Sequence, residues 1–393
     1  MSGNGDRLVI TNGKLILDDA IVVGKDIVIE RGAIKEIADR ADARRGRVIN
    51  ANGNFVAPGF IDVHTHGSFG IDLVRATPEE IAYLQKRLPE TGVTSFLATA
   101  AGIRQTAIRS TVQSLQDARK RTAPAGAQIL GVHIEGPYLN PARSGAIPKE
   151  LLEPFDPSRC DFLDTIEPPA TMTLAPELVN ALALIDELTR RGIVPCGGHS
   201  EATFEQTVDA VNHGLKHITH LFNAMSQLHH RSPNILAAGL ALDELTVELI
   251  VDDVHVPSPF ISLVTKAKGF DRIILVTDAT AAASQPDGQY TFGGVKVVVR
   301  DGIARTPDGA LAGSTLTLNR AVRNFREFTC ASMQDAVKTV TSNPARLLGV
   351  HNKKGKIHPG MDADITIFDN DLTILATVVA GRTVWQSAPA PHQ

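Results

Sequence analysis

Residues 56–67 read Val56-Ala-Pro-Gly-Phe-Ile-Asp-Val-His-Thr-His-Gly67, a short apolar run that leads directly into two histidines separated by one residue. We interpret Phe60–Val63 as a strand. Side chains alternate between the two faces of a strand, so His64 and His66 point the same way at its end. Two imidazoles from one rigid strand end supply half of a metal site. The alternative is a simple polar turn after the strand, and ligands elsewhere in the chain decide between the two.

Short apolar runs recur along the chain, and amphipathic helical stretches lie between most of them. The runs are Phe60–Val63, Thr94–Ala98, Gln128–Ile134, Met172–Leu174, Ile193–Cys196, Lys216–Thr219, Thr246–Val251 and Arg272–Val276. The helical stretches include Pro78–Glu90, Arg104–Arg121, Pro176–Arg191, Ala202–Asn212 and Ser258–Lys268, several of which open at Thr, Pro or Ser and close at Gly. Strands that alternate with helices in this way favour a (β/α)8 TIM barrel, whose active site lies at the carboxyl ends of the strands. An open doubly wound sheet is the alternative, but no Gly-x-Gly-x-x-Gly follows the first strand.

The two ends of the chain consist of short β segments separated by turn signals. Residues 8–57 contain several such segments between Asn-Gly, Gly and Asp positions, and the C-terminal tail repeats the pattern up to Thr383-Val-Trp385. Isolated hairpins are rarely stable. We therefore expect residues 1–57 and 356–393 to form one small β-sandwich domain beside a barrel of residues 58–355, with a loop between Thr280 and Ala310.

Polar residues follow most of the barrel runs, at the positions where an active site is expected. His64, His66, Glu135, His199 and His220 offer nitrogen and oxygen ligands suited to zinc, iron or another divalent ion. Asp278, after the last run, either caps the next segment or accepts a proton from water and passes it to a leaving group. A metal that acidifies water and polarises a carbonyl indicates hydrolysis of an amide or an ester.

The composition is that of an ordinary globular enzyme, with 393 residues, 43% hydrophobic and 21% charged. A net charge of −4 excludes a basic field for nucleic acid. No apolar run approaches the length of a membrane span, and the first residues lack the apolar core of a signal peptide, so we expect a cytoplasmic protein without a membrane partner. Cys160, Cys196 and Cys330 are odd in number and widely spaced, so we interpret them as small hydrophobic residues rather than a disulfide framework.

Six sequence motifs resemble the amidohydrolase superfamily and, within it, the N-acetylglucosamine-6-phosphate deacetylase family. They are Pro58-Gly-Phe-Ile-Asp-Val-His-Thr-His-Gly67, His133-Ile-Glu-Gly-Pro-Tyr138, Gly197-Gly-His-Ser200, Thr219-His-Leu-Phe-Asn-Ala-Met225, Thr277-Asp-Ala279 and Leu311-Ala-Gly-Ser-Thr-Leu-Thr317. The resemblance implies Asp278 as the catalytic acid and base, and Glu135, His199 and His220 as the ligands of the main metal. His64 and His66 then add a second ion, so one or two divalent ions bind per chain, with zinc expected and iron, manganese or cobalt as alternatives.

The same resemblance implies a small amino-sugar phosphate as substrate. Arg231 and His255 would grip its phosphate, while Gly136, Asn223 and Ala224 would hold the sugar and phosphate. The implied reaction is deacetylation of N-acetylglucosamine 6-phosphate to glucosamine 6-phosphate and acetate, in amino-sugar catabolism. Members of the family are often homodimers that share phosphate contacts, so we expect a homodimer.

Two positions depart from the family pattern. Ile147 stands where a histidine that contacts the substrate is expected, and Asp253 replaces the more usual glycine near His255. An alternative substrate, N-acetylgalactosamine 6-phosphate or an unphosphorylated N-acyl compound, therefore stays open. A metal-free, non-enzymatic amidohydrolase-like protein is the more remote alternative, because in such a protein the ligand positions should be lost.

Overall fold

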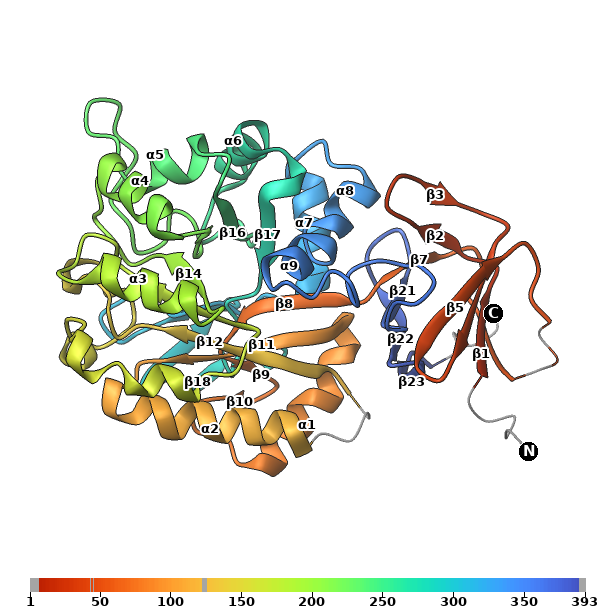
Figure 1. Cartoon of the computed structure of the whole chain (residues 1–393). Coiled ribbons are helices and arrows are strands. Elements are labelled where there is room, and N and C mark those ends of the chain that lie inside the picture. The colour runs from red at the N-terminus through yellow and green to blue at the C-terminus, as the bar shows by residue number, and fades with distance from the viewer. Residues whose placement is uncertain (1–6, 43, 45, 122–125, 389–393) are drawn as a thin grey trace.

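The computed structural model describes residues 7–42, 44, 46–121 and 126–388, and its largest sheet has eight parallel strands (Figure 1). These strands are β8 (Phe60–Thr65), β11 (Val93–Ala101), β12 (Gln128–Glu135), β13 (Ala170–Leu174), β14 (Val194–Gly197), β15 (His217–Ile218), β16 (Thr246–Ile250) and β17 (Ile273–Val276). Strands that are neighbours in the sheet also follow one another in the chain. The expected (β/α)8 barrel is confirmed, and each expected apolar run coincides with one of its strands.

The barrel closes between its first and last strands, just beyond their carboxyl ends. Thr65 forms a parallel bridge with Ala279. The backbone N–H of Asp278 donates to the carbonyl oxygen of His64 at 2.9 Å. The same contacts that close the barrel therefore fix the His-x-His pair beside Asp278.

Helices lie around the barrel strands and bury their apolar faces against them (Figure 1). They are α1 (Pro78–Arg87), α2 (Gln105–Arg121), α3 (Ala181–Arg190), α4 (Phe204–His213), α5 (Ile235–Ala241), α6 (Ser258–Lys268), α7 (Leu318–Phe328), α8 (Met333–Lys338) and α9 (Ser342–Leu347). Helix α3 begins five residues later than expected from its pattern, because Asn180 has a left-handed φ of 63° that a continuous helix does not allow.

Among the helices of the described residues, none is long and apolar enough to cross a membrane. The expectation that no signal peptide is present rests partly on residues 1–6, which lie outside the described residues.

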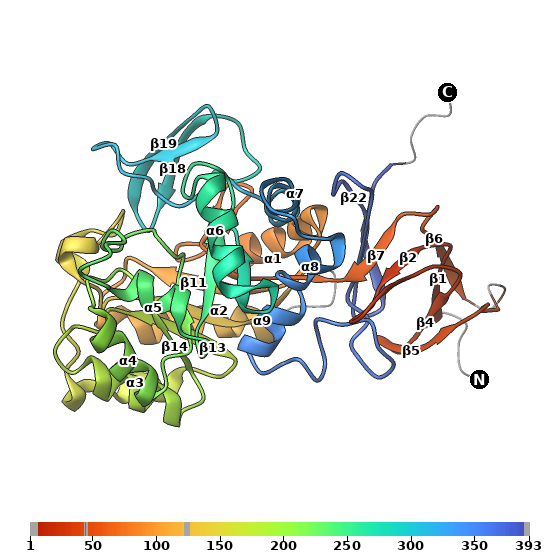
Figure 2. The same cartoon turned by 90° about the horizontal axis from the view of Figure 1, so that it is seen from above.

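The two ends of the chain form the small β domain on one side of the barrel (Figure 2). Its N-terminal strands are β1 (Arg7–Thr11), β2 (Lys14–Ile16), β3 (Ile21–Val22), β4 (Asp26–Glu30), β5 (Ala33–Ala38), β6 (Arg47–Asn50) and β7 (Phe55–Pro58), and its C-terminal strands are β21 (Ile365–Phe368), β22 (Ile374–Val379) and β23 (Arg382–Gln386). One sheet has the order β5-β4-β1-β6 and the other β23-β22-β21-β7-β2-β3. Strands β7 and β21 pair antiparallel, which joins the two ends of the chain. The exact domain limits stay a prediction, although β7 runs on to Pro58.

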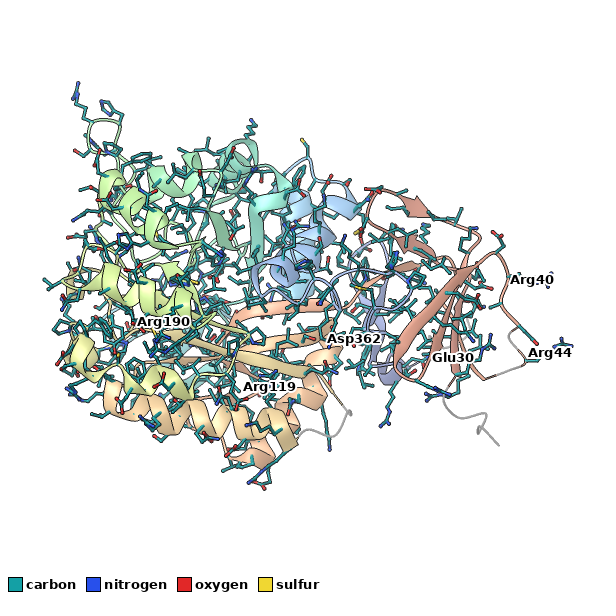
Figure 3. The ribbon with its side chains drawn as sticks, in the orientation of Figure 1. Glu30, Arg40, Arg44, Arg119, Arg190 and Asp362 are labelled. Carbon is teal, nitrogen blue, oxygen red and sulfur yellow. The ribbon has the colours of Figure 1, made fainter. Side chains whose placement is uncertain are left out.

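Polar contacts hold the small domain against the barrel. The Lys354 side chain is buried and donates to Asp364 at 2.5 Å, to Asp362 at 2.9 Å and to Gln128 at 2.8 Å, the last of which lies on β12. Asp362 lies at this junction, whereas Arg40 and Arg44 lie at the outer edge of the small domain (Figure 3).

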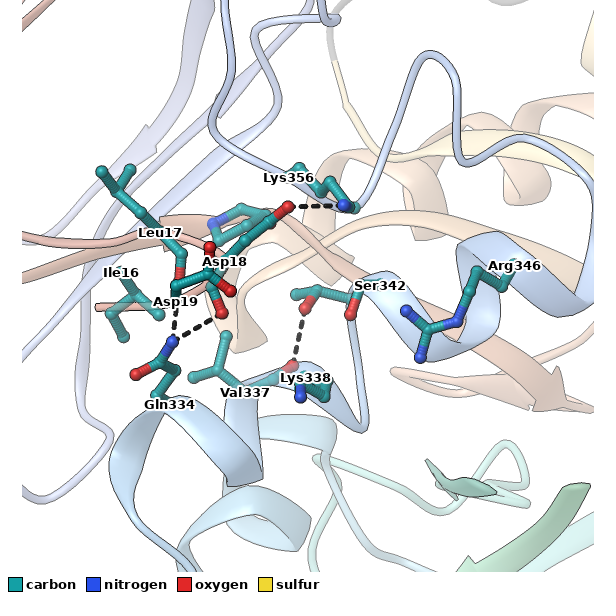
Figure 4. A pocket seen from close by; sticks show the side chains of 13 residues that line it. Ile16, Leu17, Asp18, Asp19, Gln334, Val337, Lys338, Ser342, Arg346 and Lys356 are labelled. Carbon is teal, nitrogen blue, oxygen red and sulfur yellow. Dashed lines mark hydrogen bonds and ion pairs between the residues drawn. The ribbon is translucent and has the colours of Figure 1, made fainter. Parts of the chain in front are cut away.

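A cavity of about 190 Å³ opens at the same junction, beside Pro58 (Figure 4). The Gln334 amide donates to the carbonyl oxygens of Leu17 and Asp18 across it, and Lys356 pairs with Asp18. Because Pro58 precedes β8, this cavity lies at the amino ends of the barrel strands, away from the residues that the sequence singles out.

The segment expected to be a loop between Thr280 and Ala310 instead contains a three-stranded sheet. Its strands β18 (Gly288–Phe292), β19 (Val295–Arg300) and β20 (Ile303–Arg305) are antiparallel, and β18 and β19 stand out from the barrel, well away from the small domain (Figure 2). Gly293 and Gly294, with φ of 53° and 89°, make the turn between the first two strands. The ring of Phe292 thereby lies 4.7 Å from that of His66.

Candidate active site

Two groups of ligand atoms meet at the carboxyl ends of the barrel strands. One group is His64, His66 and Glu135 and the other is Glu135, His199 and His220, and within each group the ligand atoms lie within 4.8 Å of one another. Glu135 belongs to both groups. Its Oε1 lies 3.1 Å from Nε2 of His199 and 3.1 Å from Nε2 of His220, whereas its Oε2 lies 3.4 Å from Nε2 of His66. One carboxylate therefore stands between two pairs of imidazoles.

The protonation of two of these imidazoles follows from their partners. Nδ1 of His199 faces the carbonyl oxygen of Arg143 at 2.8 Å, and Nδ1 of His64 faces Oε2 of Glu248 at 2.9 Å. A carbonyl or a carboxylate can only accept, so both Nδ1 atoms carry a proton and each Nε2 is the ring nitrogen left for a metal. The Nε2 atoms of His199 and His220 lie 3.1 Å apart, and those of His64 and His66 lie 3.2 Å apart. Imidazole nitrogens that converge so closely would fit a divalent cation between them.

Three of the site residues have an unusual backbone conformation. The φ angles are 48° at His199, 28° at His220 and 46° at Asp278. The left-handed region costs a residue with a side chain on the order of 1–3 kcal/mol, and such residues cluster at active sites. In these three residues the strained backbone turns each side chain toward the same cavity, which all three line.

Asp278 faces both histidines of the first pair. Its Oδ1 lies 2.9 Å from Nε2 of His66 and 3.6 Å from Nε2 of His64. Burial favours the neutral acid, but the charge of His64 and the hydrogen bond from His66 outweigh burial and lower the pKa of Asp278. The carboxylate form is therefore favoured, as a proton acceptor requires.

A second aspartate holds the two strands that carry these groups. Asp62 Oδ2 accepts from the Thr277 hydroxyl at 2.7 Å, and Asp62 Oδ1 accepts from the backbone N–H of His64 at 3.3 Å. Burial raises the pKa of Asp62 to about 6 in spite of these hydrogen bonds. Asp62 thus ties the residue before Asp278 to the first histidine.

A cavity of about 250 Å³ adjoins the ligand groups and brings together eight of the site residues expected from the sequence. They are His66, Glu135, His199, His220, Asn223, Ala224, His255 and Asp278. His64 lies fully buried behind His66. The rest of the wall is mainly apolar and is formed by Gly145, Ala146, Ile147, Phe292, Ala310, Leu311 and Gly313.

Comparison with known proteins identifies the family of this site. Residues 55–384 match the amidohydrolase family, which covers most of the chain. The chain belongs to the amidohydrolase family. An N-acetylglucosamine-6-phosphate deacetylase of Bacillus subtilis is 36% identical over 98% of this chain and 99% of its own length. An N-acetylgalactosamine-6-phosphate deacetylase of Escherichia coli is 35% identical over 85% of this chain and 89% of its own length.

The solved structures agree with this assignment. A mutant N-acetyl-D-glucosamine-6-phosphate deacetylase from Mycobacterium smegmatis, in complex with N-acetyl-D-glucosamine 6-phosphate, superposes with a TM-score of 0.88. It is 30% identical and covers 96% of this chain and 99% of its own. The expected family is confirmed, and the family together with the two ligand groups supports a divalent metal in this amidohydrolase.

Two expected substrate residues of the amidohydrolase lie away from the cavity. Gly136 follows Glu135 with a φ of 87° and does not line the cavity. Arg231 is exposed on the loop before α5, which stands out from the barrel at the upper left of Figure 1. Its backbone N–H lies 3.3 Å from Nδ1 of His229. Arg231 is not among the residues that line the cavity.

His255 lines the cavity and is held by an aspartate three residues earlier. Nδ1 of His255 lies 2.6 Å from Oδ2 of Asp252, and the His255 side chain is only 6% exposed. Burial lowers the pKa of this imidazole, but its hydrogen bond to Asp252 and the charge of that carboxylate outweigh burial, so the pKa of His255 is raised. The raised pKa favours a cation there, which suits a phosphate ligand.

The two departures from the family pattern have different surroundings. The Asp253 carboxylate accepts from the backbone N–H of Ser258 at 2.7 Å, so it is bound to the start of α6. Ile147 lines the cavity and is 4% exposed, because it packs in an apolar cluster with Ala101 and Leu139. The negative charge is therefore engaged with the helix, whereas the isoleucine contributes an apolar wall.

Two residues of the site escaped the sequence analysis. Glu248 lies on β16, is 3% exposed and contacts His64, and its charge inside the apolar run Thr246–Val251 was a signal that could have identified it. Burial raises the pKa of Glu248, but the charge of His64 and the hydrogen bonds from His217 and His64 hold it well below its usual range. Phe292 could not be found, because it belongs to the sheet that replaced the expected loop.

Proposed function

We infer that this amidohydrolase removes the acetyl group of N-acetylglucosamine 6-phosphate, with acetate and glucosamine 6-phosphate as products. The observation that carries the inference is Glu135 between two histidine pairs, with Asp278 facing one of the pairs in the same cavity as His255. Two relatives that match nearly the whole chain, at 36% and 30% identity, are named deacetylases of this compound. We place the reaction in amino-sugar catabolism in the cytoplasm. The metal-free alternative has no support, because all five ligand positions are kept.

The proposed metal centre consists of Glu135, His199 and His220, with His64 and His66 as the additional ligands of a second ion. A divalent ion held there polarises the acetamide carbonyl and makes water more acidic. The nitrogen and oxygen donor set suits zinc, which we propose as the metal, and it also suits iron, manganese or cobalt. The metal content of the purified protein decides both the identity and the number of the ions.

Asp278 is the proposed proton carrier of the reaction. Its Oδ1 takes a proton from the water that attacks the acetamide carbonyl carbon, and it later gives that proton to the amide nitrogen of the sugar. The C–N bond then breaks and the neutral amine leaves. The lowered pKa of Asp278 keeps the carboxylate ready for the first transfer, while the contact with His66 fixes its direction.

We propose that the phosphate of the substrate binds at His255 and that Arg231 of a second copy completes this grip in a homodimer. The support for the second part is that Arg231 is exposed on a protruding loop and does not reach the cavity of its own chain. A guanidinium binds phosphate in a bidentate manner, which a point charge does not. Gly136, Asn223 and Ala224 are proposed to position the sugar and its phosphate.

A panel of substrates tests the function. Acetate release is measured with N-acetylglucosamine 6-phosphate, N-acetylgalactosamine 6-phosphate and unphosphorylated N-acetylglucosamine, and metal content is determined on the same sample. We expect the highest kcat/KM with the first compound. The second compound is the alternative substrate, favoured by the Escherichia coli relative and by Ile147. Equal turnover of the unphosphorylated sugar would contradict the phosphate assignment.

Mixing two inactive variants tests the proposed sharing of Arg231. Arg231→Ala and Asp278→Asn are prepared separately and then allowed to exchange subunits. If Arg231 acts on the partner's site, one site of each mixed dimer is intact, and a 1:1 mixture recovers about a quarter of the wild-type rate. A mixture no more active than its components would place Arg231 outside the shared site.

A further inference from the structure

Glu248 projects from β16 into the barrel interior beneath the ligand groups and accepts three hydrogen bonds there. Oε2 lies 2.9 Å from Nδ1 of His64 and 3.0 Å from the backbone nitrogen of His220, and Oε1 lies 3.0 Å from Nε2 of His217. The residue is 3% exposed. A buried carboxylate with three donors is fully engaged, so its position and direction are fixed.

The direction of these hydrogen bonds decides which ring nitrogen of His64 faces the other ligand atoms without a hydrogen bond to Glu248. A carboxylate only accepts, so His64 donates from Nδ1, and Nε2, the atom that faces His66, is the one left to bind a metal. His217 donates from Nε2 in the same way, and its Nδ1 lies 2.6 Å from the Thr246 hydroxyl oxygen. A chain of hydrogen bonds thus connects Thr246, His217 and Glu248 to the ligand histidine His64.

His220, which belongs to the other ligand group, depends on the same carboxylate through its backbone. Its φ of 28° is strained and needs support from its surroundings. Its Nδ1 is buried without a hydrogen-bond partner among the described residues, so the far side of the ring receives no polar support of the kind that His199 has. The hydrogen bond from the His220 N–H to Glu248 provides that support at the backbone.

We propose that Glu248 is a positioning residue that orients His64 and His220 together and so sets the affinity of both ligand groups for divalent metal. The proposal rests on the metal centre inferred above. One carboxylate oxygen serves both ligand groups, so loss of the carboxylate affects them together. Glu135 connects the two groups from the cavity side and Glu248 connects them from the barrel interior.

The test is the metal affinity of Glu248→Gln, measured by competition of zinc with a chromogenic chelator and without any substrate. The amide keeps the volume of the side chain but cannot accept at both ends. Outer partners of metal ligands typically change affinity by about 10–100-fold, and we expect a loss in that range, with fewer ions retained per chain. The matched control is Glu177→Gln, because Glu177 also accepts three hydrogen bonds, from Asn140, Ser200 and Glu201, but none from a ligand.

Zinc affinity within about twofold of wild type in a folded Glu248→Gln protein would overturn the proposal, even if acetate release is lost. If this variant does not fold, ring-nitrogen NMR of the zinc-loaded wild type decides, since His64 must carry its proton on Nδ1, and a proton on Nε2 would contradict the role. A change of substrate preference with normal zinc binding would instead concern only the proposed function. A wild-type protein that binds no divalent ion would refute the metal centre and this role together.

Discussion

The proposed metal end of the cavity and the residues proposed to bind phosphate, together called the phosphate end, are built in different ways. At the metal end, His64, Glu135 and Asp278 lie in or directly after barrel strands, are at most 8% exposed and are held by hydrogen bonds from neighbouring strands. At the phosphate end, His255 and Arg231 lie in longer connections, and Arg231 is exposed. The groups proposed to break the bond are thus fixed by the fold, whereas the groups proposed to recognise the substrate lie in loops that can vary without disturbing the barrel.

The largest effect is expected at the metal end, from Asp278→Asn. The amide cannot take a proton, and general acid–base catalysis contributes about 10²–10⁴-fold to rates. We therefore expect kcat for acetate release to fall by about that factor, with KM nearly unchanged. Zinc content measured on the same sample must stay at the wild-type level. A variant that keeps more than a tenth of the wild-type kcat would assign the proton transfer to another group.

The same difference between the two ends explains how far the sequence could predict the site. Parallel strands of a barrel place their carboxyl ends on one rim, so His64, Glu135 and His199 could be brought together from strand order alone. Arg231 could not be placed, because nothing in the sequence sets the path of its exposed loop. Glu248 could be noticed as a charge inside an apolar run, but its contacts with His217 and His64 depend on the register of β16 against β15, which the sequence does not reveal.

The fold itself was predictable where the pattern was repetitive. The eight apolar runs identified the barrel because each one has to be buried on both faces. The predicted start of α3 was five residues too early, because the hydrophobic periodicity does not reveal the left-handed conformation of Asn180. The sheet at Gly288–Arg305 was missed because it packs in its own small apolar cluster rather than in the repeating barrel pattern.

At the phosphate end, His255→Gln should have an intermediate effect. A hydrogen bond to a charged group contributes about 1.5–3 kcal/mol, which corresponds to about 10–100-fold in kcat/KM for the phosphorylated substrate. The unphosphorylated sugar should be converted at nearly the wild-type kcat/KM, which makes the ratio of the two substrates the measurement. An equal loss with both substrates would mean that His255 supports the catalytic groups rather than the phosphate.

The pH dependence of KM should sharpen the assignment of His255. Asp252 raises the pKa of His255, so the imidazole stays protonated below that raised pKa and its attraction for phosphate is lost as the pH rises through it. Above about pH 7 the phosphate is already mostly a dianion, so its own titration contributes little. We expect KM for the phosphorylated substrate to rise as the pH passes through the raised pKa of His255. In Asp252→Asn the same rise should begin at lower pH, because the charge that raises the pKa is gone.

The KM of the unphosphorylated sugar serves as the reference for this titration and should not follow the same curve. A rise common to both substrates would indicate a group at the metal end. An Asp252→Asn profile that coincides with the wild-type profile would show that the Asp252 charge does not control the binding of phosphate.

The smallest effect is expected from Ile147→Val, which removes one methylene from the apolar wall between the two ends. Ile147 packs with Ala101 and Leu139, so the loss should lower the free energy of unfolding by about 0.5–1.5 kcal/mol, measured by urea denaturation. Because this side chain has no polar group to distinguish sugar hydroxyls, the ratio of kcat/KM for the two N-acetyl hexosamine phosphates should stay within about twofold of wild type. A larger change in that ratio would mean that the isoleucine contacts the hydroxyl at which the two sugars differ.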